Sequence, residues 1–212
     1  MSTAIIIGGS SGIGKAIINN LKDDYSTINM SRHNYDEFID VTNYNVVKNT
    51  FDNIFTYNID ADILIYCAGF VKPQGIFELT PEMWNQTINT NLNGAYYCTQ
   101  QFIKRNIGSN KKIIYIASTA GTRPQVGWSA YAASKAALIN FALTMHEELK
   151  AFNVQVYCIA PGRCATPLRQ ILAPTEDQTQ IMQPNEVADF VRYILDDKSN
   201  VLCGQVITVK KI

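Results

Sequence analysis

The sequence has few of the residues that build metal sites and disulfide frameworks. Its 212 residues include only two histidines, His33 and His146, which lie far apart in the chain. The five cysteines are an odd number and contain no C-x-x-C pair. Zinc sites and disulfide-rich scaffolds depend on such pairs and clusters. We therefore predict no metal site and free thiols, which suit a reducing cytoplasm.

Net charge and long apolar runs are also missing. Eighteen Lys and Arg residues balance eighteen Asp and Glu residues. The chain thus has no basic field of the kind that attracts nucleic acid or an anionic membrane. No apolar stretch is as long as a membrane span, and no basic segment precedes the first apolar run. We expect a cytoplasmic protein without a nucleic-acid or membrane partner.

Charged residues are scarce, at 17% of the sequence, against about a quarter in typical proteins. A surface with few charges is compatible with burial against other subunits. The hydrophobic share is 47%, and the length is that of a globular chain with a substantial core. The simplest organisation is one domain over residues 1–212.

A glycine-rich turn is the first motif that points to a ligand. The β-branched run at residues 4–7 predicts a buried strand, and residues 15–21 predict a helix with one apolar side. Between them lie Gly9, Gly12 and Gly14, which permit a tight turn and close approach to a ligand. Free N–H groups at a helix N-terminus attract a pyrophosphate. We predict that a dinucleotide binds at Gly8, Ser10, Ser11, Gly12, Ile13 and Gly14.

The end of the second strand indicates which dinucleotide binds. Residues 27–30 predict this strand, and Ser31 and Arg32 follow it. In a doubly wound fold this strand end faces the adenosine ribose, where an acidic residue would bind the 2′-hydroxyl. Arginine supplies a planar donor fork that suits a 2′-phosphate instead. These residues favour NADP over NAD, with a solvated surface Arg32 as the alternative.

Strands and helices alternate along the chain. Such alternation predicts a seven-stranded parallel sheet with helices on both faces, a doubly wound, Rossmann-like α/β fold. We expect the strands at residues 4–7, 27–30, 37–41, 62–66, 112–117, 154–159 and 206–209. We expect the main helices at residues 15–21, 46–55, 81–103 and 186–195, with a further helix around Tyr131.

A tyrosine and a lysine one helical turn apart are the first candidates for chemistry. Tyr131 and Lys135 share one face of the predicted helix. A nearby ammonium favours the phenolate and lowers the pKa of the phenol, so the pair suits proton transfer. Ser118 ends the fifth strand, where parallel sheets place catalytic groups. Asn91 lies inside the long apolar helix and is either a satisfied core amide or a functional one.

These motifs, in this order and at this spacing, resemble those of the classical short-chain dehydrogenase/reductase (SDR) family. The likeness extends over nearly the whole chain, beginning with the nucleotide-binding turn at residues 8–14. The positions of the family's catalytic tetrad hold Asn91, Ser118, Tyr131 and Lys135. The resemblance also implies cofactor contacts at Ser31, Arg32, Asp40, Val41, Ala68, Gly69, Tyr131, Lys135, Pro161, Gly162 and Thr166.

The resemblance implies a role for each member of the tetrad. Tyr131 would protonate a carbonyl oxygen as hydride arrives, and Ser118 would hold that oxygen. Lys135 would lower the pKa of Tyr131 and bind the nicotinamide ribose, while Asn91 would anchor a water. The implied protein is an NADP(H)-dependent oxidoreductase of a small carbonyl compound or secondary alcohol, assembled as a homodimer or homotetramer. A non-catalytic NADP(H)-sensing module and an epimerase or dehydratase are the alternatives.

Several positions depart from the family pattern. Tyr66 and Cys67 replace two asparagines that brace the sheet, and Gly8 replaces the usual threonine of the turn. The segment between Thr166 and Pro184 is short. Because this segment normally covers the substrate, we expect a small or open substrate pocket.

Two arginines, Arg163 and Arg169, lie beside the expected substrate site. Arginine binds phosphate and carboxylate groups well. We hypothesise that one of the two binds an anionic group of the substrate, with ordinary surface charge as the alternative.

Overall fold

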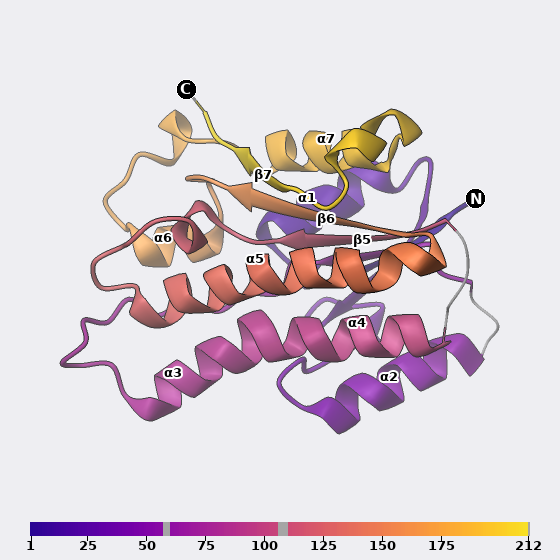
Figure 1. The fold of residues 1–212 in the computed structure, drawn as a ribbon. Coiled ribbons are helices and arrows are strands. Elements are labelled where there is room, and N and C mark those ends of the chain that lie inside the picture. Colours follow the sequence, from indigo (N-terminus) through magenta and orange to yellow (C-terminus); the bar gives the residue numbers. More distant parts are fainter. Residues whose placement is uncertain (57–59, 106–109, 212) are drawn as a thin grey trace.

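In the residues that the structure describes, seven parallel strands form one sheet. The computed structural model describes residues 1–56, 60–105 and 110–211. The strands follow the order β3-β2-β1-β4-β5-β6-β7 across the sheet (Figure 1). They are β1 (Thr3–Ile7), β2 (Ser26–Ser31), β3 (Glu37–Phe38), β4 (Ile63–Tyr66), β5 (Lys111–Ile116), β6 (Val154–Pro161) and β7 (Val206–Val209). This arrangement confirms the predicted doubly wound, Rossmann-like α/β fold.

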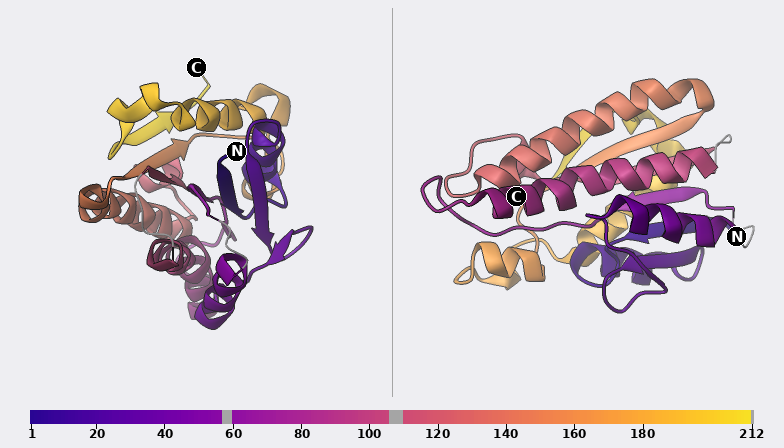
Figure 2. Two further views of the ribbon diagram at one scale, coloured as in Figure 1. Left: turned by 90° about the vertical axis from the view of Figure 1, so that its right-hand side faces the viewer. Right: turned by 90° about the horizontal axis from the view of Figure 1, so that it is seen from below.

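Helices cover both faces of the sheet (Figure 2). On one face lie α1 (Gly12–Leu21) and α7 (Pro184–Leu195). On the other lie α2 (Tyr44–Thr56), α4 (Gly94–Arg105) and α5 (Ser129–Leu149). None of the described helices is long and apolar enough to cross a membrane.

Alternation along the central strands divides the buried side chains into two cores. Ile5 and Ile7 of β1 belong to the core beneath α2, α4 and α5, whereas Ala4 and Ile6 belong to the core beneath α1 and α7. Successive side chains of a strand point to opposite faces of the sheet. A strand that is apolar at every position therefore requires helices on both sides, which explains the continuous apolar run in the sequence.

The strand order changes direction between β1 and β4. β1 pairs in parallel with β2 on one side and with β4 on the other. The carboxyl ends of the strands open at one edge of the sheet, on the left in Figure 1. In doubly wound sheets a ligand crevice lies outside the carboxyl ends at such a switch point. The fold therefore places the candidate site at this edge.

The long predicted helix contains an extra backbone feature. It consists of α3 (Pro81–Ile88), a π-helical turn at Asn89–Asn93 and α4. The Thr80 hydroxyl accepts a hydrogen bond from Met83 N at 3.3 Å and so caps the start of α3. The prediction missed the π turn, a feature that is frequent at functional sites. The residue types in this segment do not distinguish a π turn from α-helix.

The third strand is shorter than predicted. It spans Glu37–Phe38 rather than residues 37–41. The Asp40 carboxylate accepts hydrogen bonds from the Thr42 N–H and hydroxyl at 3.0 and 2.8 Å. This local turn competes with strand pairing and ends the strand. Val41 is nevertheless buried, so its apolar character reflects packing in the core and not strand structure.

A short helix after β6 was not predicted. α6 (Pro167–Leu172) begins after Thr166, whose hydroxyl accepts a hydrogen bond from Arg169 N at 3.1 Å. Threonine followed by proline is a helix-start signal, so the sequence did contain this information. The segment with α6 closes on itself, because Ala165 N donates to Met182 O at 2.7 Å.

Candidate active site

The glycine turn leads from β1 into α1 and packs against the residues that follow β4. Gly8 has φ +86 and Gly12 has φ +53, a backbone conformation that favours glycine. A Cβ on Gly8 would lie 2.7 Å from Ala68 N, so a side chain there would push the two strand ends apart. Glycine at position 8 is thus a structural requirement of this turn.

The same turn offers a fitting cradle for a pyrophosphate. The first turn of α1 contains no acidic residue, which leaves its N-terminal field attractive to anions. A Cβ on Gly14 would lie 2.3 Å from Gly8 O, so only glycine lets the helix start this close to the turn. The backbone N–H groups and the missing side chains together suit a dinucleotide.

A cleft of about 350 Å³ extends from this turn along the carboxyl ends of β2, β4 and β5. Every predicted cofactor residue lines it except Pro161 and Gly162. Those two line a neighbouring cleft that shares Tyr131 and Thr166 with the first, and their contact with the cofactor stays a prediction. The prediction did not include several other lining residues: Ile7, Met30, His33, Ile39, Thr42, Cys67, Thr90, Ile116, Ala117, Pro167 and Leu168. Most adjoin a predicted site residue in sequence, including Thr90, which directly precedes Asn91.

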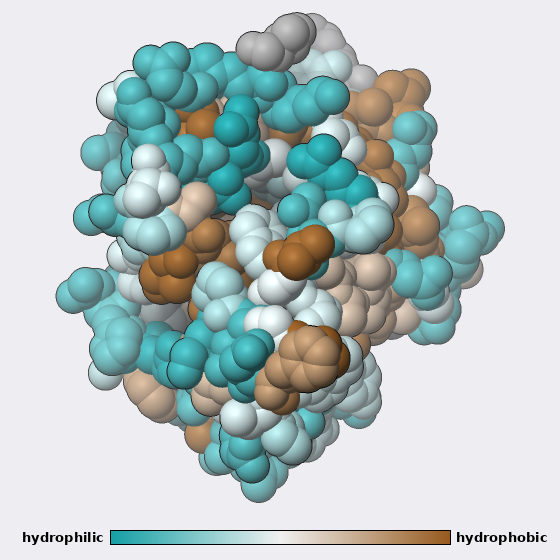
Figure 3. All heavy atoms as spheres, turned by 90° about the vertical axis from the view of Figure 1, so that its left-hand side faces the viewer, coloured by the Kyte–Doolittle hydropathy of each residue, from teal (hydrophilic) through white to brown (hydrophobic). Residues whose placement is uncertain are grey.

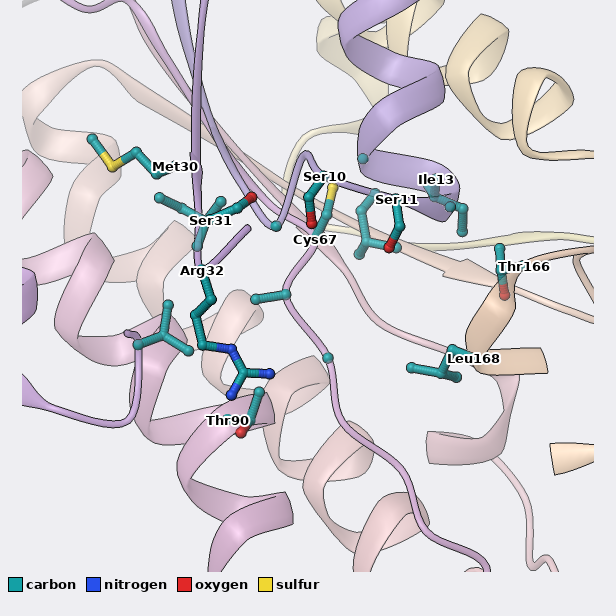
Figure 4. A pocket seen from close by; sticks show the side chains of 18 of the residues that line it. Ser10, Ser11, Ile13, Met30, Ser31, Arg32, Cys67, Thr90, Thr166 and Leu168 are labelled. Carbon is teal, nitrogen blue, oxygen red and sulfur yellow. The ribbon is translucent and has the colours of Figure 1, made fainter. Parts of the chain in front are cut away.

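Arg32 is directed into this first cleft, with its guanidinium near Thr90 (Figure 4). It has no ion-pair partner among the residues that the structure describes. The neighbouring Ser31 hydroxyl is buried and donates to Asn29 Oδ1 at 2.7 Å. Arg32 is therefore the group at this strand end that is free to bind a phosphate.

The neighbouring cleft, of about 240 Å³, is lined by Ser118, Trp128 and Arg169 among others. Tyr131 lines both clefts, whereas Lys135 lines only the first and Ser118 only the second. The structure thus brings together three of the four predicted catalytic residues. The phenol lies where the two clefts meet.

Burial determines the acidity of the Tyr131 and Lys135 pair. Only 8% of Tyr131 and 4% of Lys135 are exposed. Lys135 Nζ lies 5.9 Å from the centroid of the Tyr131 ring and donates to Ile116 O at 2.9 Å. Burial lowers the pKa of Lys135 to about 8.

The pKa of Tyr131 differs from the prediction. Burial raises it above its usual value, while a hydrogen bond with Ser118 and the charge of Arg169 lower it in part. Lys135 was predicted to lower this pKa; in the structure burial of the phenol outweighs the groups that lower it, and the contribution of Lys135 stays a prediction. The phenol is thus held in its protonated form.

Asn91 lies in neither cleft and is fully buried. Its Nδ2 donates to Phe70 O at 3.0 Å and to Ser134 Oγ at 2.9 Å, and its Oδ1 accepts from Phe70 N at 2.7 Å. Both amide hydrogens are used. Of the two alternatives for Asn91, the side chain is a satisfied core amide, and it fixes the chain after β4 to α5 beside Lys135. With both amide hydrogens used, the second lone pair of Oδ1 is the group left to hold a water, and that role stays a prediction.

Tyr66 takes over the bracing that the family's asparagine provides. Its hydroxyl is buried and donates to Thr90 O at 2.5 Å, which ties β4 to the π turn. A Cβ on Gly94 would lie 2.5 Å from the Tyr66 hydroxyl, so glycine makes room for the ring. Tyr66 is therefore accommodated by Gly94. Thr90, which accepts the Tyr66 hydrogen bond, lies on the wall of the first cleft.

Arg163 and Arg169 both bind one internal carboxylate. Arg169 donates to Glu176 through Nε at 2.5 Å and Nη2 at 2.7 Å, and Arg163 donates to the same carboxylate at 3.1 Å. These arginines hold the pKa of Glu176 below its usual value. The Arg169 guanidinium also lies 5.8 Å from the ring centroid of Trp128. The predicted anion partner of these arginines is thus already supplied by the chain.

The fold, the glycine turn and the Ser–Tyr–Lys arrangement are matched by a comparison with known families. Residues 2–177 match the sequence model of the family described as short chain dehydrogenase. The chain belongs to this family. It is an oxidoreductase whose fold binds a nicotinamide cofactor.

Relatives are similar to nearly the whole chain. The 3-oxoacyl-[acyl-carrier-protein] reductase of Thermotoga maritima is 27% identical over 232 residues, covering 97% of this chain and 94% of that protein. A (2S)-[(R)-hydroxy(phenyl)methyl]succinyl-CoA dehydrogenase subunit of Thauera aromatica has the same identity, 27%, and the same coverage, 97% and 94%. The ligand-free aldohexose dehydrogenase of Thermoplasma acidophilum is 26% identical, with a TM-score of 0.89, covering 98% of this chain and 92% of that one.

Proposed function

We propose that this SDR enzyme interconverts a carbonyl compound and its alcohol with NADP(H), using Tyr131 as the proton donor and acceptor. The observation that carries the proposal is the position of Tyr131, a buried phenol on the wall common to two clefts. One cleft suits a dinucleotide, and the other is lined by a hydroxyl that can bind an oxygen. A proton donor at their junction is placed where a carbonyl would meet a hydride.

The first cleft holds the cofactor in this proposal. The glycine turn would bind the pyrophosphate and Arg32 the 2′-phosphate. Lys135 would bind the nicotinamide ribose beside Tyr131. When bound there, NADPH supplies the hydride, with its two electrons, that reduces the carbonyl carbon. The preference for NADP over NAD rests on Arg32, which matches a phosphate better than a neutral hydroxyl.

The chain's own groups handle the proton and the oxygen. The Tyr131 phenol donates its proton to the carbonyl oxygen, which becomes the hydroxyl of the product. Ser118 donates a hydrogen bond to this oxygen while negative charge develops on it. The phenolate left on Tyr131 is stabilised by the Lys135 ammonium and then takes a proton from solvent. In alcohol oxidation the same phenolate accepts the proton.

The relatives are named for substrates of different kinds, a carrier-bound oxoacyl group, an aromatic CoA thioester and an aldohexose. We therefore commit to the reacting group, a carbonyl or secondary alcohol, and not to one of these compounds. Fold alone does not fix the substrate.

A cofactor titration followed by a substrate panel tests the proposal. NADPH and NADH are titrated by their fluorescence into the purified protein, and a panel of ketones and aldehydes is then assayed with the tighter cofactor. We expect tighter binding of NADPH and reduction of at least one carbonyl compound. Binding of NADPH without turnover on any member of the panel would contradict catalysis and favour a sensing module. An Arg32→Asp variant separately tests the cofactor preference, which should reverse.

A further inference from the structure

We propose that a second hollow beside the substrate cleft binds a phosphate group carried by the substrate. The basic hollow, as we name it, has a volume of about 370 Å³ and lies at the carboxyl ends of β6 and β7. Its polar lining includes Arg123, Arg163, Lys210, Lys211, Thr119 and Thr208. The inference extends the proposed function by naming a substrate class, and it rests on that function.

The described lining of the basic hollow is positive, and three of its four cations form no ion pair. It contains four cationic side chains and no acidic side chain. Among the described residues, Arg123, Lys210 and Lys211 form no ion pair. Arg163 meets Glu176 at 3.1 Å with its side chain 65% exposed, so this arginine retains donors for another anion. A concave surface with one sign of charge concentrates the opposite charge.

The cations come from separate parts of the chain. Arg123 follows β5, Arg163 follows β6, and Lys210 and Lys211 follow β7. Their meeting at one place therefore depends on the sheet order β5-β6-β7 and not on a local run of basic sequence. The Thr119 and Thr208 hydroxyls add donors that suit the several oxygens of a phosphate.

The basic hollow and the substrate cleft are continuous. Thr119, Arg123, Gly162 and Arg163 line both. Ser118, the residue that would hold the carbonyl oxygen, directly precedes Thr119. A molecule whose carbonyl lies at Ser118 and Tyr131 can thus extend past Thr119 into the basic hollow. Figure 3 views this edge of the sheet and shows hydrophilic surface over much of its upper half, on the side of β7.

The substrate cleft itself is a poorer place for an anion. Glu176 already neutralises Arg169 there, with two hydrogen bonds at 2.5 and 2.7 Å. A substrate phosphate next to that carboxylate would be repelled by it. We therefore move the expected anion site from Arg169, which has two hydrogen bonds to Glu176, to the basic hollow, where Arg163 has a single contact with that carboxylate and the other three cations form no ion pair among the described residues.

Binding of inorganic phosphate tests the site without any need for turnover. Phosphate is titrated calorimetrically into the enzyme saturated with NADP⁺, so that the cofactor cleft is already filled. The native enzyme is compared with the K210Q/K211Q variant and with K22Q/K104Q, which removes two exposed lysines elsewhere. We expect phosphate affinity to fall about tenfold in K210Q/K211Q, as for lost charge-assisted hydrogen bonds, and to stay unchanged in the control. No phosphate binding, or an equal loss in both variants, would overturn the inference.

A matched substrate pair tests the link to catalysis. The kcat/KM for dihydroxyacetone phosphate and for dihydroxyacetone is measured with NADPH in the same three proteins. We expect a preference for the phosphorylated ketone that K210Q/K211Q loses and the control keeps. Reduction of neutral carbonyls without any phosphate preference would overturn this inference and leave the proposed function standing. Phosphate binding in an enzyme that reduces no carbonyl would overturn the assignment to a substrate together with the proposed function.

Discussion

At the scale of single residues, two buried groups of α5 control the proton. The pKa of Tyr131 is raised by burial, so the phenol keeps its proton through the neutral range. The pKa of Lys135 is lowered to about 8, so its ammonium persists below that pH and is lost above it. Carbonyl reduction needs both groups in their protonated forms. The low-pH side of the neutral range therefore favours reduction.

This gives a prediction for the pH profile. The kcat for carbonyl reduction should be level from about pH 6 to 7 and fall as pH rises through about 8, because Lys135 loses the charge that stabilises the Tyr131 phenolate. Steady-state rates with saturating NADPH and a neutral ketone, recorded across this pH range, measure the pH dependence of kcat. A rate that rises through pH 8 would contradict the assignment.

Asn91 should matter for stability more than for proton transfer. An Asn91→Ala change removes the partner of the part-buried Phe70 N–H and carbonyl and of the buried Ser134 hydroxyl. Each unsatisfied buried group costs about 1–3 kcal/mol, so we expect the free energy of unfolding to fall by about 2–4 kcal/mol. Urea denaturation measures the loss. Asn93→Ala is the control, since the Asn93 amide bonds only within the π turn, to Asn89, and should cost less than about 1 kcal/mol.

At the scale of elements, Glu176 links α6 to the segment that follows β6, beside the substrate cleft. It ties Arg169 of α6 to Arg163, next to the point where Ala165 pairs with Met182. These hydrogen bonds of Glu176 hold the short segment between Thr166 and Pro184 in place.

Removal of the Glu176 carboxylate should make the segment between Thr166 and Pro184 more mobile. In Glu176→Gln we expect faster amide hydrogen exchange over residues 166–178, because the charge-assisted hydrogen bonds from Arg163 and Arg169 weaken. For the same reason the KM for the carbonyl substrate should rise about threefold to tenfold. Glu148→Gln, at an exposed site on α5, is the matched control. Exchange that stays at the native rate in this segment would show that Glu176 does not hold it.

The elements also mark where sequence reasoning succeeded and failed. The apolar runs predicted the central strands, because a strand that is covered by helices on both faces is apolar at nearly every position. The end of β3 was missed because the Asp40 side chain, and not the apolar pattern, ends it. α6 was missed although Thr166 and Pro167 signalled its start. The residue types of the π turn gave no signal, and its contact with Tyr66, whose hydroxyl donates to Thr90 O, joins parts of the chain that lie far apart in sequence.

At the scale of the whole molecule, the sequence predicted which groups meet but not what surrounds them. Ser118 and Tyr131 come together because one follows the end of β5 and the other lies in the first turn of α5. The pairing of Glu176 with two arginines is a contact of side chains across a loop, and no motif encodes it. The burial that raises the pKa of Tyr131 likewise depends on packing from several elements.

Assembly is a further property of the whole molecule. We predict a homodimer or homotetramer through the helices that contain Asn91 and Tyr131, where Trp84 and Tyr96 are exposed and aromatic groups favour interfaces. Light scattering after gel filtration should give twice or four times the chain mass of 23.7 kDa. Tyr96→Glu should shift the protein to smaller species, and Tyr35→Glu, at another exposed tyrosine, should not. A native monomer at every concentration would contradict the prediction.

The most direct measurement of the central claim is the turnover of a Tyr131→Phe variant. The change removes one hydroxyl and leaves the ring that packs against Trp128. With NADPH and a ketone that the native enzyme reduces, we expect kcat to fall about 10³-fold, as for loss of a general acid, while NADPH binding stays within about twofold. Tyr115→Phe, at a buried tyrosine that lines neither of the two clefts, should keep the native kcat. Turnover of Tyr131→Phe at the native rate would contradict the account.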